Sequence, residues 1–465
     1  MQGKALPGFR DFYPEELKLR NHIFATWRSV AARYGFEEYD GPPLEPLELY
    51  TQKSGDEIVQ QLYAFKDKGD REVALRPEMT PTLARMVAAH AQALKKPIRW
   101  FSMPQLFRYE RQQRGRLREH FQLNMDIIGE AGPLADAELI AAAIDIMRAF
   151  GFGPKDVQAR ISDRRVLRAL LLGRGITEAQ LPAAYAAIDK ADRVPQQVLV
   201  EMMREAFGDP DPILEIAKLK SLDAVTGALA KVKGGEEVGE PLRTAIEALN
   251  AMGLGDFVQV DLTIVRGLAY YTGIVFELFD AAKRLRAICG GGRYDDLLKA
   301  LGGPDLPALG FGMGDVVLGE LLKERHVAPQ ASTELGAFLV AVSGEDIAPV
   351  LQLAHAMRDR GIAVEYGLRH AAVRKQLFFA FRHFLRGLRQ ISGRPFGVLT
   401  QRYLLRPEGE FLQNRIVDGE FLLGVSPARV CVRHQQCDGR ALRSIREIRQ
   451  ERAAAQNHGF ALSGV

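Results

Sequence analysis

Five arginines fall within 11 residues in the segment 107–126, where their side chains could bind phosphate. They are Arg108, Arg111, Arg114, Arg116 and Arg118. Strand-like runs flank the cluster, so the pattern predicts a hairpin that presents guanidinium groups. A guanidinium can donate two parallel hydrogen bonds to a phosphate group, and we expect some of these arginines to face a common pocket. Taken alone, the cluster leaves open a solvated arginine-rich turn.

A second candidate segment, residues 265–273, places an arginine before two adjacent tyrosines. Arg266 stands at the end of an expected strand and is followed by Tyr270 and Tyr271. A fixed cation beside aromatic rings with polar tips suits a ligand that carries both a small planar group and an anion. The alternative is a strand whose tyrosines only pack.

Two further patterns are weaker on their own. In the run 290–295, three glycines precede Arg293 and Tyr294, and glycines allow a ligand to approach the backbone closely, although turns use them too. In the run 75–80, Glu78 and Thr80 would lie at a junction between a strand and a helix. There they could bind an ammonium group, and a helix cap is the alternative.

Apolar periodicity predicts the elements that position these residues. Helical spacing favours helices over residues 16–34 and 134–150, and residues 165–255 are rich in helix formers and predict an α-helical insertion. Short apolar runs separated by polar turns predict antiparallel strands at 73–75, 100–103, 122–128, 257–265, 273–279 and 309–314. We expect one sheet to contain these strands together with the glycine run.

A domain boundary is expected near 327–336, because a new alternation of strand and helix begins beyond it. The pattern predicts a strand at 337–342, a helix at 347–360, a strand at 362–366 and a helix at 372–384. This order indicates a small separate α/β domain.

Composition excludes several classes of protein. The 465 residues are 47% hydrophobic and 26% charged, which is ordinary for a folded protein of about three domains and excludes disordered and fibrous chains. A net charge of +4 is too small to indicate a polyanion partner without a local patch. The three cysteines, at 289, 431 and 437, form neither a disulfide framework nor a zinc-ligand pattern, and we expect no bound metal centre. The first 16 residues lack a signal-peptide run and no later stretch could span a membrane, so we expect a cytoplasmic protein.

The C-terminal 90 residues differ in composition from the rest. All 17 lysines lie at or before Lys375, and the residues after it contain 14 arginines against 7 acidic residues. The net positive charge of the chain is therefore entirely C-terminal. An out-of-frame translation and a basic extension that contacts RNA are the two explanations that remain open.

In order and spacing, these motifs resemble the histidyl-tRNA synthetases, a family of class II aminoacyl-tRNA synthetases. The arginine hairpin resembles the family's motif 2, residues 266–273 its histidine-specific segment, residues 42–45 motif 1, and residues 310–314 the start of motif 3. The resemblance implies an α+β fold, with a class II antiparallel sheet flanked by helices and a helical insertion. It also implies a catalytic domain at 1–330 and an anticodon-binding-like α/β domain at 336–430, leaving a basic tail at 431–465.

The resemblance further implies the activity of a histidine–tRNA ligase. ATP, accompanied by Mg²⁺, would activate histidine as an adenylate, and a homodimer would transfer the histidyl group to tRNA(His). Arg111 and Arg266 would stabilise charge at the α-phosphate, and Arg114 and Arg116 would complete the ATP site. The remaining roles concern histidine: Glu78, Thr80, Gln122 and Asp126 would bind its amino and carboxylate groups, and Tyr271 and Tyr294 would line the imidazole pocket.

The chain departs from the family pattern at three places in the motifs. Val316 and Val317 stand where motif 3 ordinarily has Glu-Arg, Ala269 replaces an aspartate, and Gln112 replaces a proline. Residues after Leu377 fit the family poorly. A non-catalytic paralogue, such as the regulatory subunit of ATP phosphoribosyltransferase, is the alternative reading. The extra α/β domain argues against it, and a tRNA sensor within a signalling protein is a third, less favoured reading.

Overall fold

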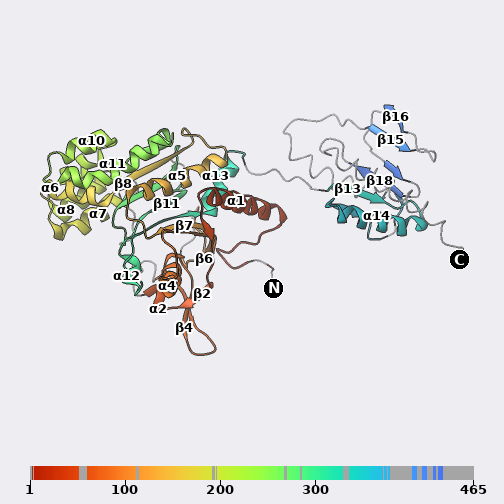
Figure 1. Cartoon of the computed structure of the whole chain (residues 1–465), viewed down its shortest axis with the longest axis horizontal. Helices are drawn as coiled ribbons and strands as arrows, with labels where there is room; N and C mark the ends of the chain where they lie inside the picture. Colours follow the sequence, from red (N-terminus) through yellow and green to blue (C-terminus); the bar gives the residue numbers. More distant parts are fainter. Residues whose placement is uncertain are drawn as a thin grey trace. The chain divides into compact units, whose positions relative to one another are not determined.

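The computed structural model divides the chain into two compact units, Met1–Pro329 and Gln330–Val465 (Figure 1). It describes residues 3, 5–51, 60–110, 115–190, 194, 196–265, 270–282, 285–327, 335–369, 371–373 and 375–376, with the backbone alone at 189, 190 and 196. Beyond these it describes the backbone of four strands between residues 401 and 432.

A nine-stranded sheet forms the centre of the first unit. Its strands are β1 (Glu37–Glu38), β5 (Ile98–Ser102), β6 (Gln105–Phe107), β7 (Glu119–Ile128), β8 (Val157–Asp163), β9 (Val258–Val260), β10 (Ile274–Asp280), β11 (Cys289–Arg293) and β12 (Ala308–Gly314). They are ordered β1-β5-β7-β12-β11-β10-β8-β9, with β6 paired to β7. The inner pairs are antiparallel, and the pairs β1–β5 and β8–β9 at the two edges are parallel.

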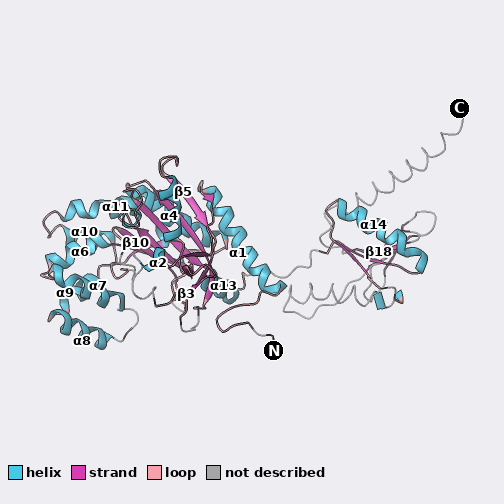
Figure 2. Cartoon of the chain, turned by 90° about the horizontal axis from the view of Figure 1, so that it is seen from below, coloured by secondary structure: helices cyan, strands magenta, loops and turns pink. Residues whose placement is uncertain are grey.

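Helices cover both faces of this sheet (Figure 2). On one face, α1 (Pro14–Arg33), α5 (Pro133–Ala149) and α13 (Asp315–Glu324) pack into the main hydrophobic core. On the other, α4 (Thr80–His90) and α12 (Leu297–Ala300) pack with the valine at position 275 and two tyrosines in a second cluster. The α+β fold expected from the sequence, an antiparallel sheet flanked by helices, is confirmed.

The predicted helical insertion lies beside β8 (Figure 1). Its helices are α6 (Arg164–Gly173), α7 (Leu181–Lys190), α8 (Gln196–Phe207), α9 (Asp211–Ala217), α10 (Leu222–Leu229) and α11 (Gly235–Ala251). The Asp163 side chain begins α6 by accepting a hydrogen bond from the backbone N–H of Arg165 at 2.8 Å. Apolar residues of α6 and α11 belong to the same core cluster as α5, so the insertion packs continuously with the sheet domain.

A small antiparallel sheet precedes α4. It consists of β2 (Leu44–Pro46), β3 (Tyr63–Lys66) and β4 (Glu72–Leu75) in the order β2-β4-β3, and the short helix α2 (Glu48–Thr51) follows β2. The expected strand at 73–75 is thus the middle strand of this sheet. Its position brings the segment between β4 and α4 close to the central sheet.

The second unit begins with a strand, a helix and a parallel strand, as predicted. These are β13 (Ala337–Val340), α14 (Ile347–Asp359) and β14 (Val364–Tyr366). The further strands are β15 (Gln401–Leu405), β16 (Phe411–Arg415), β17 (Leu423–Val425) and β18 (Ala428–Val432), of which β18 pairs with β13. Most of the helix expected at 372–384 lies outside the described residues.

Two details of the central sheet differ from the sequence prediction. The strand expected at 257–265 ends at Val260, because the Asp261 carboxylate accepts hydrogen bonds from the N–H and the hydroxyl of Thr263, which turn the chain. Strand β8 was not expected, although its apolar residues Val157, Ala159 and Ile161 alternate with polar ones. Within the described part of the chain, no helix combines the length and the apolar character needed to cross a membrane.

Candidate active site

The arginine cluster forms the predicted hairpin next to β7. Its two arms meet where the Arg108 N–H donates a hydrogen bond to the Arg118 carbonyl at 2.9 Å. Arg116 pairs with Glu110 at 2.8 Å, and the Arg118 guanidinium lies over the Tyr109 ring, 4.2 Å from its centre. Arg111 and Arg114 lie outside the described residues.

A cavity of about 850 Å³ opens between this hairpin and the central sheet. Arg108 and Arg116 line it together with Gln122, so two of the three described hairpin arginines share one pocket, as the sequence predicted. Its other walls are residues 263–265, residues 285–288, Ile188 of the helical insertion, Val316 and Val317 of α13, and side chains or backbone of β8, β10, β11 and β12.

Glycines leave the side chains of β7 room to lie over β12. A Cβ added at Gly310 would come within 2.0 Å of the Asp126 carboxylate, and one added at Gly312 within 2.3 Å of the Gln122 amide nitrogen. Gly290 and Gly312 are register partners on β11 and β12 and both line the cavity. The floor of the site is therefore built from backbone and from the side chains that reach across it.

The cavity contains functional groups that sequence reasoning did not select. His120 approaches Gln122 with its Nε2 at 3.4 Å from Oε1, and burial together with the charge of Arg108 lowers the pKa of His120 to about 3. Its imidazole is therefore neutral at physiological pH. Arg160 of β8 and Glu277 of β10 are register partners that also line the cavity. The alternation of apolar and polar residues in β8 was a signal that could have placed Arg160, and Glu277 interrupts the apolar run of β10.

Asp126 and Tyr294 form a buried pair, and neither residue is among those that line the cavity. The Tyr294 hydroxyl donates a hydrogen bond to Asp126, and the two residues are 3% and 4% exposed, respectively. Burial raises the pKa of Asp126 to about 7, and the hydrogen bond from Tyr294 offsets only part of this effect. The Asp126 carboxyl therefore holds its proton more tightly than an exposed aspartate does.

The tyrosines named from the sequence come together. The ring centroids of Tyr270 and Tyr294 are 6.0 Å apart in an edge-to-face arrangement, and those of Tyr270 and Tyr271 are 5.1 Å apart. Tyr271 and Tyr294 both belong to the cluster formed with α4. Arg266 lies outside the described residues.

Glu78 and Thr80 lie at the expected junction between β4 and α4. Glu78 is 7% exposed, and Thr80 is the first residue of α4. The residue in the cap position is Met79, which provides no side-chain hydrogen bond, so neither predicted residue caps the helix in that position. Apolar residues of α4 pack against Tyr271 and Tyr294, which brings this helix to the tyrosine side of the site.

The segment that follows β12 closes one side of the cavity. Val317 is 9% exposed, and a Cβ added at Gly115, at the tip of the hairpin, would lie 3.3 Å from its side chain. Asp315 pairs with Arg10 at 2.8 Å, and the Glu119 carboxylate accepts a second bond from the same guanidinium at 2.6 Å. Arg10 thus connects the start of α13 with the hairpin strand β7.

Among the residues that the structure describes, no group of three or more histidine, cysteine, aspartate or glutamate side chains could hold a metal ion. The cavity has one acid paired with arginine, Glu110, and one acid on the sheet, Glu277. This arrangement suits a site whose charge comes mainly from arginines and that binds an anionic ligand.

Comparisons with known proteins agree on one family. The family model described as histidyl-tRNA synthetase matches residues 8–314. The histidine–tRNA ligase of Opitutus terrae is 47% identical over 385 residues, which cover 81% of this chain and 88% of that protein. The chloroplastic/mitochondrial histidine–tRNA ligase of Arabidopsis thaliana is 41% identical over 361 residues, covering 77% of this chain and 74% of its own length.

Solved structures share the fold. The crystal structure of histidyl-tRNA synthetase from Nostoc sp. PCC 7120 has a TM-score of 0.71 at 24% identity and covers 83% of this chain and 90% of its own. A Bacillus halodurans structure described as an ATP phosphoribosyltransferase regulatory subunit/histidyl-tRNA synthetase has a TM-score of 0.68 at 24% identity, covering 78% and 92%.

Proposed function

This chain belongs to the histidyl-tRNA synthetase family, and from that membership we propose that it is a histidine–tRNA ligase with ATP, histidine and tRNA(His) as substrates. The observation that carries the proposal is the cavity in which Arg108 and Arg116 of the hairpin meet Gln122 above a glycine floor. The cavity offers arginine side chains for phosphates, and the buried pair of Asp126 and Tyr294, which does not line it, lies on the same sheet as Gln122.

The proposed reaction has two steps. First, a carboxylate oxygen of histidine attacks the α-phosphorus of ATP, the bond from phosphorus to the bridging oxygen breaks, and pyrophosphate leaves. Then a hydroxyl of the terminal ribose of tRNA attacks the carbonyl carbon, AMP leaves, and its phosphate takes the hydroxyl proton. Negative charge develops at the α-phosphate in the first step, so fixed arginines at that position accelerate it.

For ATP we propose four arginines. Arg111 and Arg266 would contact the α-phosphate and stabilise the charge that develops there, and Arg114 and Arg116 would bind the remaining phosphates. Arg116 lines the cavity with an exposed ion pair to Glu110, which leaves its guanidinium able to reach a ligand. Val317 occupies the position of the family's usual motif 3 arginine, so the hairpin would provide that charge instead.

For histidine we propose the residues around Asp126. Glu78, Thr80 and Gln122 would bind the amino and carboxylate groups, and Tyr271 and Tyr294 would enclose the imidazole. The hydrogen bond between Tyr294 and Asp126 places that acid at the tyrosine side, where it can also accept a hydrogen bond from a ring N–H. An amino acid without ring nitrogens would leave these buried polar groups unpaired, and this would provide the specificity.

The proposal extends to the accompanying ion and to the assembly. Mg²⁺ would enter as the ATP complex, held mainly by phosphate oxygens, since Mg²⁺ usually keeps several waters and takes few protein ligands at such sites. We further propose a homodimer that acts in the cytoplasm, with the second unit, Gln330–Val465, contacting the tRNA. Sedimentation of the purified protein tests the dimer.

Histidine-dependent exchange between ATP and pyrophosphate tests the proposal directly. The assay isolates adenylate formation from tRNA binding, and the other amino acids serve as controls. We expect exchange with histidine alone. No exchange by folded protein would overturn the proposal and favour a non-catalytic paralogue.

A further inference from the structure

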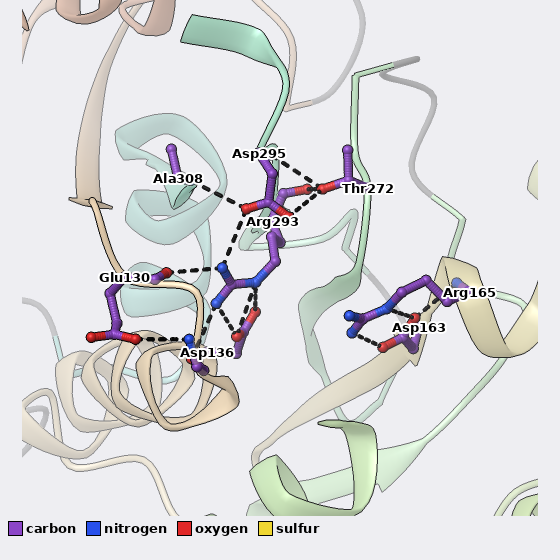
Figure 3. Close-up of polar contacts among 9 residues, drawn as sticks. Glu130, Asp136, Asp163, Arg165, Thr272, Arg293, Asp295 and Ala308 are labelled. Carbon is purple, nitrogen blue, oxygen red and sulfur yellow. Dashed lines mark hydrogen bonds and ion pairs between the residues drawn. The ribbon is translucent and has the colours of Figure 1, made fainter. Parts of the chain in front are cut away.

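Arg293, the last residue of β11, makes a set of contacts that the proposed substrate site does not explain. Its side chain is 3% exposed. The Nε group donates to the Asp136 carboxylate at 3.2 and 3.3 Å, and the terminal nitrogens donate to the carbonyls of Glu130 at 2.9 Å and Gly132 at 3.2 Å and to Asp295 at 3.3 Å (Figure 3). This buried guanidinium is therefore fixed from several directions.

The same residue anchors the two segments that carry the tyrosines. Its backbone carbonyl accepts a hydrogen bond from the Thr272 N–H at 2.8 Å. The Thr272 hydroxyl donates to Asp295 at 3.1 Å and accepts from the Asp295 N–H at 3.2 Å (Figure 3). Tyr271 directly precedes Thr272, and Tyr294 lies between Arg293 and Asp295, so both tyrosines are bounded by one hydrogen-bonded frame.

Close packing adds a second constraint on this frame. A Cβ at Gly273 would lie 3.2 Å from the Arg293 side chain and 3.3 Å from the Arg165 guanidinium, so the chain after Tyr271 passes close to both arginines. Asp136 lies in the first turn of α5, where a negative charge is favourable. Burial raises the pKa of Asp136 to about 6, against the opposing effect of Arg293, so its carboxylate remains ionised at neutral pH.

We propose that Arg293 and Asp136 are positioning residues for the histidine site, holding Tyr271 and Tyr294 in the geometry that recognises the side chain of the amino acid. This inference rests on the proposed function. The described lining of the cavity includes neither of these residues and neither tyrosine, so the link between them is the hydrogen-bonded frame of Thr272, Arg293 and Asp295. Loss of one partner would leave the other charge buried and the frame loosened.

The test compares two substrates of one enzyme. Asp136→Asn keeps the shape of the side chain and removes its charge, while Thr272→Val removes one hydroxyl of the frame without leaving a buried charge. We expect each variant to raise the KM for histidine by about 10-fold or more in the exchange assay, because a small misplacement of a contact group costs affinity. The KM for ATP should change less than about 3-fold. Arg293→Lys should also raise the KM for histidine, since lysine cannot reproduce the planar set of hydrogen bonds.

A matched control separates positioning from general loss of stability. Asp280, 2% exposed, pairs with Arg325 at 3.0 Å at the other end of β10. Asp280→Asn should lower thermal stability without changing the ratio of the two KM values. The inference is wrong if Asp136→Asn and Thr272→Val change both KM values together, or if they behave like Asp280→Asn. If Asp136→Asn does not fold, Thr272→Val decides.

Direct histidine binding, measured by calorimetry, distinguishes this inference from the proposed function. Wild-type protein that binds histidine without catalysing exchange would overturn the ligase proposal, and weaker histidine binding by the variants would then still support the positioning role. Wild-type protein that binds no histidine would overturn both. Equal histidine affinity in the wild type and the variants would overturn the positioning role alone.

Discussion

The two ends of the candidate site are built on different principles. At the proposed histidine end, Asp126 and Tyr294 are buried and hydrogen-bonded to each other. At the proposed ATP end, Arg116 pairs with Glu110 at the cavity, where the Arg116 side chain is 42% exposed. The first arrangement favours selectivity, because a wrong ligand leaves buried groups unpaired. The second favours binding of a flexible, highly charged ligand, since exposed arginines can adjust to it at little cost.

The largest effect is expected from a substitution at the buried pair of Asp126 and Tyr294. Asp126→Asn removes the acid that accepts the Tyr294 hydrogen bond, and we expect kcat/KM for histidine in the exchange assay to fall on the order of 10³-fold. The KM for ATP should stay within about 3-fold of the wild-type value, because the arginines proposed to bind ATP are unchanged. Asp145→Asn is the matched control, since Asp145 accepts a 2.8 Å hydrogen bond from Tyr34 away from the site. Equal losses in the two variants would contradict the assignment.

A smaller loss is expected from a substitution of Arg266, which the sequence assigns to the α-phosphate. Arg266→Ala would remove charge stabilisation at the α-phosphate, and we expect kcat to fall by about 10²-fold or more. Arg28→Ala, on an exposed arginine of α1 that pairs with Glu38, provides the control for loss of a surface arginine. An unchanged kcat in Arg266→Ala would remove that residue from the mechanism.

The open end should respond more mildly. Arg116→Ala deletes a guanidinium at the rim, and we expect the KM for ATP to rise about 10-fold with little change in the KM for histidine. Thermal stability should be nearly unchanged, because a partly exposed ion pair contributes little. Glu110→Gln, which breaks the same pair from the other side, should leave the KM for ATP near the wild-type value. A rise in both variants would assign the effect to the ion pair instead.

The smallest expected effect concerns thermal stability. Here Asp126→Asn should be favourable, whereas in the first prediction the same substitution lowers activity. Burial raises the pKa of Asp126 from its ordinary 3.8 to about 7, so between those values the unfolded chain loses a proton that the folded chain keeps. Stability therefore falls as pH rises from about 4 to 7. Asparagine cannot ionise, so Asp126→Asn should raise the melting temperature by a few degrees at pH 8 and by little at pH 4. Thermal unfolding at both pH values measures this, and a pH-independent difference would contradict it.

Local sequence patterns predicted the helices and strands better than they predicted the contacts between these elements. Short apolar runs located β7, β10 and β12, and the spacing of apolar residues located α1 and α5. Strand β8 was missed although Val157, Ala159 and Ile161 alternate with polar residues, and its antiparallel pairing with β10 sets Arg160 opposite Glu277.

The candidate site was predictable to a similar extent. Arg116 and Gln122 were expected to serve the site and both line the cavity. The pair of Asp136 and Arg293 was not expected, since 157 residues separate its members and no local pattern connects them. Contacts between distant segments depend on how the sheet is assembled. A single sequence reports such contacts only through isolated charged residues in apolar surroundings.

The glycines under the site have an evolutionary consequence. Since a Cβ at Gly310 would lie 2.0 Å from the Asp126 carboxylate, a larger residue at 310 requires Asp126 to move or to become smaller. A Cβ at Gly312 would similarly require the end of the Gln122 side chain to move. Strands β7 and β12 should therefore vary as coupled pairs among related sequences, and the choice of acid at position 126 is inherited together with the bare backbone opposite it.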